Sequence, residues 1–150
     1  MSATFHATLV FEREIAAAPK AVFAAFADPA ARAQWGTPSD TAVIIYDDAD
    51  FREGGLDHFR CGPKASPNIH GVTQYLDIVP DRRVISSETL VVDGRRLCVS
   101  LTTLEVTPDG SKTRFKNTTQ LASFIGEDMV KGFTTGTNAS LDGLVRYFQK

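Results

Sequence analysis

Cysteine is scarce in this sequence, and long hydrophobic segments are missing. The two cysteines, Cys61 and Cys98, lie in different predicted strands and form no CxxC motif. We therefore expect free thiols in a reducing compartment, with a disulfide between them as the open alternative. No run approaches the roughly 18 apolar residues that span a bilayer, and the first residues lack a basic region leading into an apolar one. The sequence predicts a cytoplasmic protein that does not enter a membrane.

An excess of basic charge is also missing. The chain has 16 lysines and arginines against 18 acidic residues, which leaves a formal net charge of -2. Such a chain has no basic face to attract a polyanion, so nucleic acid is not expected as a partner. Its 150 residues and hydrophobic content of 43% fit one globular domain, residues 1–150, with its own core.

The short motifs of common catalytic and cofactor sites are absent as well. There is no Gly-x-Ser-x-Gly elbow, no cysteine with an evident histidine partner and no glycine-rich phosphate loop. His58, Cys61 and His70 are residue types that bind metals, but their spacing forms no closed four-ligand set. We therefore expect neither a metal nor a cofactor, and the catalytic residues, if there are any, stay unknown.

What the sequence does contain is a succession of short segments with polar and apolar residues in alternation. Together with β-branched residues and turn signals, this pattern predicts strands. They are expected at residues 5–15, 41–47, 56–61, 70–79, 83–92, 95–106 and 112–122. Pro19 and Pro29 stand at favourable first positions of two short helices, the second of which runs to Trp35. Strands joined by short turns, with segregated helices, predict an α+β fold with a curved antiparallel sheet of about seven strands.

One long helix is predicted from about residue 126 to the end of the chain. Its apolar residues recur at three- and four-residue spacing and form one broad stripe, which could cover the sheet. Gly132, Gly136 and Gly143 line one flank of that stripe. Each glycine costs roughly 1 kcal/mol relative to alanine in a helix. The glycines therefore indicate either free space for a ligand cavity or tight packing, and the sequence leaves both open.

Several segments together resemble a known family. They are FEREIAAAPKAVFAAFADPAARAQW, FREGG, IHGV, YLDIVPDRRVISSETL, SLTTLEVTPDGSKTRF and GFTTGTNASLDGLVRYF. In order and spacing they resemble the activator of heat-shock protein 90 ATPase homologue-like family, over nearly the whole chain. The resemblance implies the START-related, helix-grip fold, in which a curved antiparallel sheet wraps on a long C-terminal helix and two short helices follow strand one.

The resemblance implies a chaperone partner only weakly. The family's closing helix commonly has Gly-Trp where this chain has Gly132-Phe133 or Gly136-Thr137. The eukaryotic co-chaperone carries an additional N-terminal domain that engages the chaperone, whereas this sequence starts at the predicted sheet. A homodimer is a further expectation, because several strands look apolar on both faces.

Polar side chains that face the long helix are the candidate ligand contacts. Asn117 and Thr119 share a face with apolar residues of their strand, so we expect them to point toward the helix. There they would contact either a ligand or each other. Phe133 and Thr137 are the candidates on the helix itself.

Three other strands supply the remaining candidates. His58 and Arg60 share one face and would orient a carboxylate or carbonyl, unless that face is exposed to solvent. Tyr75 would donate its hydroxyl to a ligand, or would lie in the core with only its hydroxyl solvated. Glu88 would have a raised pKa and act as a base if its face points inward. The opposite face of that strand is comparably apolar, so the direction stays open.

The sequence therefore predicts a binding module for a small apolar or amphipathic ligand, in a cavity between the C-terminal helix and the sheet. The alternative from the same superfamily is a cyclase- or lyase-like enzyme that acts on a hydrophobic or polyketide-like substrate. It would use His58, Tyr75 or Glu88 as acid or base. A third alternative is a protein interaction akin to chaperone activation, which needs an exposed patch in place of a cavity.

Overall fold

The computed structural model describes residues 4–37 and 39–149. Strand β1 (Phe5–Ile15) is followed by two short helices, α1 (Pro19–Ala27) and α2 (Pro29–Trp35). Six strands come next: β2 (Ala42–Asp48), β3 (Leu56–Pro63), β4 (Ile69–Val79), β5 (Arg83–Val92), β6 (Arg95–Asp109) and β7 (Lys112–Ser123). The last element is α3 (Glu127–Tyr147). The order of elements predicted from the sequence is confirmed.

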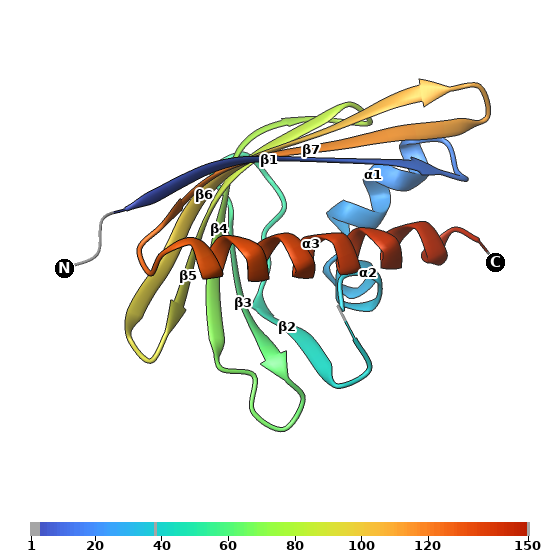
Figure 1. Ribbon diagram of the computed structural model, residues 1–150. Helices are drawn as coiled ribbons and strands as arrows, with labels where there is room; N and C mark the ends of the chain where they lie inside the picture. The colour runs from blue at the N-terminus through green and yellow to red at the C-terminus, as the bar shows by residue number, and fades with distance from the viewer. Residues whose placement is uncertain (1–3, 38, 150) are drawn as a thin grey trace.

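All seven strands form one antiparallel sheet in the order β1-β7-β6-β5-β4-β3-β2. Consecutive strands from β2 to β7 are neighbours, and β1 closes onto β7 at the far end. Figure 1 shows that the sheet curves around α3, which runs across its concave side. This is the curved sheet on a long C-terminal helix that the sequence predicts.

Local sequence explains where several elements begin and turn. Pro19 and Pro29 occupy the first positions of α1 and α2, and the Asp28 side chain accepts a hydrogen bond of 3.0 Å from the amide of Ala30. The turn between β5 and β6 is Asp93-Gly94, and both residues have positive φ, 51° and 77°. A two-residue hairpin turn of this sequence matches the right-handed twist of the strands that it connects.

Two apolar clusters hold the helices against the sheet. The larger one joins α1, α2 and the C-terminal half of α3 to one end of the sheet. Its buried residues are Phe11, Ile15, Val22, Ala25, Phe26, Ala31, Trp35, Val106, Phe115, Leu141 and Leu144. A smaller cluster of Cys98, Leu121 and Val130 lies under the N-terminal half of α3. The helix is therefore fixed over the β1, β7 and β6 side of the sheet.

The strand register shows which residues share the face beneath α3. Residues directly opposite each other on paired strands point to the same side of a sheet. One row of opposite residues runs Leu121, Ser100, Glu88, Thr73 and Asp57 from β7 to β3. Leu121 packs with Val130 of α3, so the whole row lies on the concave face. Glu88 therefore points to the helix side, which the alternation in β5 alone left open.

Within the described ranges, no helix has both the length and the apolar character needed to cross a membrane.

Candidate functional site

Glu88 occupies a central position on the concave face. Its carboxylate accepts a hydrogen bond of 3.4 Å from the Thr73 hydroxyl, and no cation lies within ion-pair distance among the described residues. Burial raises the pKa of Glu88 to about 7, and the Thr73 hydrogen bond opposes that rise only in part. The side chain can therefore gain or lose a proton near neutral pH, as an acid or base must.

The two cysteines also lie on the concave face, on either side of Glu88. Burial is the main cause that raises the pKa of Cys61 to about 11 and that of Cys98 to about 12. The charge of Glu88 is the second cause for both thiols. Both are free thiols. At neutral pH they are protonated and behave as small apolar groups, so neither is a reactive nucleophile.

The face of α3 that carries Phe133 and Ser140 leaves space at Gly136. Phe133 packs on the smaller cluster, and the Ser140 hydroxyl donates a hydrogen bond of 2.6 Å to the Gly36 carbonyl. Gly136 lies three residues after Phe133 and four before Ser140, hence on the same helix face. A Cβ at Gly136 would meet no heavy atom within 4 Å. Thr137 follows it and is half-buried.

Gly143 behaves in the opposite way. A Cβ there would lie far inside van der Waals distance of the Trp35 carbonyl oxygen, so α3 approaches α2 as closely as a glycine permits. The helix thus contains both kinds of glycine that the sequence left as alternatives. Gly143 allows close packing, and Gly136 borders free space.

A buried polar cluster joins α2 to strands β3 and β4. Arg32 of α2 is 9% exposed, and its Nη1 donates to Asp57 Oδ2 at 2.6 Å and to the Tyr75 hydroxyl oxygen at 2.9 Å. The Tyr75 hydroxyl donates to Asp57 Oδ2, and the amide of Asp50 donates to Asp57 Oδ1 at 3.1 Å. The Arg32 guanidinium also lies over the Tyr46 ring, 4.5 Å from its centroid.

The ionisation states in this cluster follow from burial and charge. Burial raises the pKa of Tyr75 far above its usual value, despite the nearby arginine, so the phenol stays protonated. Burial alone would lower the pKa of Arg32, but Tyr46, Tyr75 and Asp57 outweigh it and raise that pKa. Arg32 is therefore a cation, and Tyr75 acts as a neutral donor and not as a base.

Arg32 and Asp57 are not among the site residues predicted from the sequence. Arg32 lies three residues before Trp35, so both point to the buried side of α2, and a lone arginine on such a face was a usable signal. Asp57 alternates with His58 in β3. It therefore points to the face opposite the one predicted for ligand contact by His58.

His58 and Arg60 do share one face of β3, as predicted, but it is the outer face of the sheet. Their opposite residues on β4 are Val72 and His70, which belong to the row away from α3. Arg60 donates to both carboxylate oxygens of Asp47, at 2.8 Å each. Both residues thus lie on the solvent side, which the sequence left as the alternative, because alternation shows which residues share a face and not which face is covered.

Asn117 and Thr119 face α3 as expected, and both are buried. The Thr119 hydroxyl donates to Asn117 Oδ1 at 2.7 Å, so the Thr102 hydroxyl, 3.1 Å away, must donate to Thr119. Their hydrogen bonds thus join neighbouring side chains, which was the structural alternative to ligand contact.

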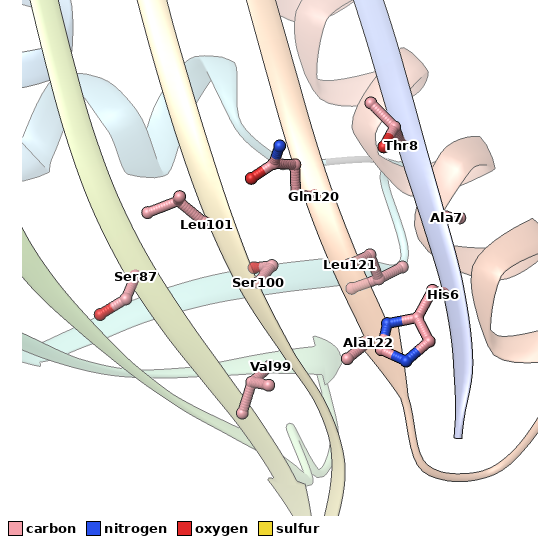
Figure 2. Close-up of a pocket in the computed structure, with 10 residues that line it drawn as sticks. All are labelled: His6, Ala7, Thr8, Ser87, Val99, Ser100, Leu101, Gln120, Leu121 and Ala122. Atoms are coloured by element: carbon pink, nitrogen blue, oxygen red, sulfur yellow. The ribbon is translucent and has the colours of Figure 1, made fainter. Parts of the chain in front are cut away.

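A separate hollow of about 560 Å³ lies on the outer face of the sheet (Figure 2). Side chains from β1, β7, β6 and β5 line it, with Thr8, Gln120, Leu101 and Ser87 opposite one another across the four strands. The hollow is open to solvent. Exposed apolar residues such as Val10 and Leu101 lie on the same face, so the homodimer stays a prediction for this surface.

The fold and the concave site define a helix-grip protein, and the comparisons with known proteins agree. The model of the family described as Activator of Hsp90 ATPase homolog 1-like protein matches residues 16–149, so the chain belongs to that family. The family and the fold class predicted from the sequence are both confirmed.

Solved structures of bacterial proteins share the fold over nearly the full chain. A Rhizobium loti protein is 36% identical, with a TM-score of 0.84, over 97% of this chain and 99% of its own. An uncharacterised Rhizobium leguminosarum protein is 27% identical, with a TM-score of 0.84, over 98% and 97%. A Chromobacterium violaceum protein is 24% identical, with a TM-score of 0.82, over 95% and 97%. No curated protein matches the chain.

Proposed function

We propose that the protein binds a small apolar or amphipathic molecule between α3 and the concave face of strands β3 to β6. The observation that carries the proposal is Glu88, a half-buried carboxyl on the concave face that pairs with no cation of the described chain. Burial of an unpaired carboxylate is energetically unfavourable, so such a group indicates a functional site. A ligand hydroxyl or amine would supply the missing partner.

The surroundings of Glu88 support an apolar ligand. Phe59, Cys61, Thr73, Ser86, Leu90 and Phe133 are half-buried on the concave side, and therefore remain partly accessible. Gly136 adds free space on the helix side. Binding sites for small molecules are commonly lined in this way, with mostly apolar walls and a few convergent polar groups.

Native mass spectrometry of the purified protein, before and after mild denaturation, tests the proposal. We expect a stoichiometric apolar compound to be released. If none is bound, the ligand-free protein should bind the uncharged fluorescent probe 1-N-phenylnaphthylamine. Absence of both would refute ligand binding at this site.

Two leucine substitutions on α3 show where binding occurs. Gly136→Leu would fill the space beneath the helix and should abolish probe binding. Thr135→Leu is the control, because Thr135 is exposed on a different face of the same helix. Equal loss of binding in both variants would show that the probe does not bind beneath the helix.

The raised pKa of Glu88 favours a second candidate, an enzyme that uses this carboxyl as acid or base. Incubation of the released compound with fresh protein distinguishes the two functions. A ligand of a binding module is recovered at unchanged mass, whereas a substrate is recovered as product. Conversion should depend on pH in a single step near 7 and should be lost in Glu88→Gln.

A further inference from the structure

The Arg32 side chain has two donors that find no acceptor in the described part of the chain. Its Nη1 supplies the hydrogen bonds to Asp57 and Tyr75, but Nε and Nη2 have no acceptor among residues 4–37 and 39–149. Both nitrogens are fully buried. An unpaired buried N–H is energetically costly, and folded proteins rarely keep one without a reason. We call the edge formed by these two N–H groups the Arg32 fork.

The same chain shows what this edge of a guanidinium binds. In Arg60, Nε and Nη2 donate side by side to the two oxygens of Asp47 at 2.8 Å. The two N–H bonds on this edge are parallel and fit one or two oxygen atoms that lie in the guanidinium plane. The Arg32 fork therefore has the shape to accept a carboxylate or a single carbonyl oxygen.

Charge distinguishes these two groups. Asp57 already neutralises Arg32, and Tyr75 stays protonated because burial raises its pKa. A second carboxylate would leave a net negative charge in a buried cluster, which is strongly unfavourable. A neutral carbonyl oxygen would satisfy the fork and leave the charge balanced.

We propose that the Arg32 fork recognises a carbonyl oxygen of the ligand, so that the ligand is an uncharged apolar ketone, ester or amide. This inference rests on the proposed ligand binding and names the ligand class for the same concave face. Asp57 lies opposite Thr73, which lies opposite Glu88, so the Arg32 cluster and Glu88 are two strand spacings apart, roughly 10 Å. A ligand of about that length contacts both.

The ligand carbonyl can reach the Arg32 fork only when the side chains that cover Arg32 move aside. Part of that cover is the Tyr46 ring, which belongs to β2. Strand β2 is at one edge of the sheet, and among the described strands it pairs with β3 alone. Edge segments with few partners open at lower free energy than the centre of a sheet, so β2 is the element that moves.

Displacement of 1-N-phenylnaphthylamine by two compounds of equal chain length, 2-nonanone and nonanoate, tests the ligand class. Nonane serves as the apolar reference. We expect the ketone to displace the probe from the unmodified protein at a concentration at least about ten-fold lower than either other compound, because a hydrogen bond to a charged donor has that effect. No preference for the ketone, or a preference for nonanoate, would overturn the inference.

Two variants remove the fork in different ways. Arg32→Met with Asp57→Asn removes both charges together, so that no unpaired carboxylate is left. Arg32→Lys keeps the cation but lacks the parallel N–H pair. Both variants should still bind the probe. In both, the displacing concentration of 2-nonanone should come within about two-fold of that of nonane, as expected without the fork. Circular dichroism identifies a variant that fails to fold, and the other variant then decides.

The control is Arg60→Met with Asp47→Asn, which removes the matching ion pair from the outer face. It should keep the ketone preference of the unmodified protein. Retention of the preference in both Arg32 variants would overturn the role of the fork while leaving ligand binding intact. Failure of the unmodified protein to bind the probe would overturn the proposed function, and the inference with it.

Discussion

Glu88 should make this protein less stable as the pH rises from 5 to 8. The unfolded chain ionises this carboxyl at about pH 4.5, whereas the folded protein holds the proton up to about pH 7. The folded state therefore binds more protons between these two values, and the free energy of unfolding falls as the pH rises through them. The stability contributed by the retained proton is complete below pH 4.5 and is lost above pH 7.

The size of the effect follows from the pKa. One pKa unit corresponds to about 1.4 kcal/mol, so a rise from 4.5 to about 7 amounts to about 3 kcal/mol. Between pH 5 and pH 8 the expected loss is about 2–3 kcal/mol, a large part of the about 5–15 kcal/mol that is typical of a small domain. Glu88→Gln keeps the shape of the side chain and removes its ionisation. The stability of the variant relative to the unmodified protein should therefore increase by that amount over the same range.

Urea unfolding curves of the ligand-free proteins at pH 5, 6, 7 and 8 measure this difference. Glu105→Gln controls for the loss of one acidic residue, because Glu105 is exposed on the outer face of β6. Its curves should follow those of the unmodified protein across the pH range. If Glu88→Gln does so as well, Glu88 is not buried on the concave face, and the main argument for a ligand site there fails.

Two further predictions concern α3 and the concave face. Gly136→Ala should stabilise the protein by about 0.5–1 kcal/mol, since alanine favours the helix and the new methyl group meets no atom. Gly143→Ala should destabilise the protein by about 1–3 kcal/mol, because the new methyl group collides with the Trp35 carbonyl and this outweighs the helix preference of alanine. Equal urea midpoints for the two variants would contradict the packing described. Cys61, with a pKa raised to about 11, should react with iodoacetamide at pH 8 far more slowly in the folded protein than in urea, and equal rates would show that its thiol is not desolvated.

The elements could be predicted from the sequence because the signals that define them are local. The alternation in β7, the prolines that begin α1 and α2, and the Asp93-Gly94 turn each depend on residues within a few positions of one another. The segregation of strands from helices then limits the arrangement to an antiparallel sheet covered by the long helix. The resemblance to the family leads to the same fold by an independent route.

The faces of the strands could not be predicted in the same way. A period of two places Glu88 on one side of β5, but only pairing through Ser100 to Leu121, beneath α3, shows that this side is concave. The same ambiguity left the direction of His58 and Arg60 open in the sequence. Their neighbour Asp57 points inward.

Tertiary contact alone created the Arg32 cluster. Arg32 and Asp57 are 25 residues apart, and nothing in either local segment indicates that they meet. The packing of α2 against the sheet excludes water from both groups, which makes their ion pair and the unused N–H donors energetically important. Local periodicity therefore determines which segments form helices and strands. The chemistry of the site depends on which side chains lose their water, and only the assembled fold decides that.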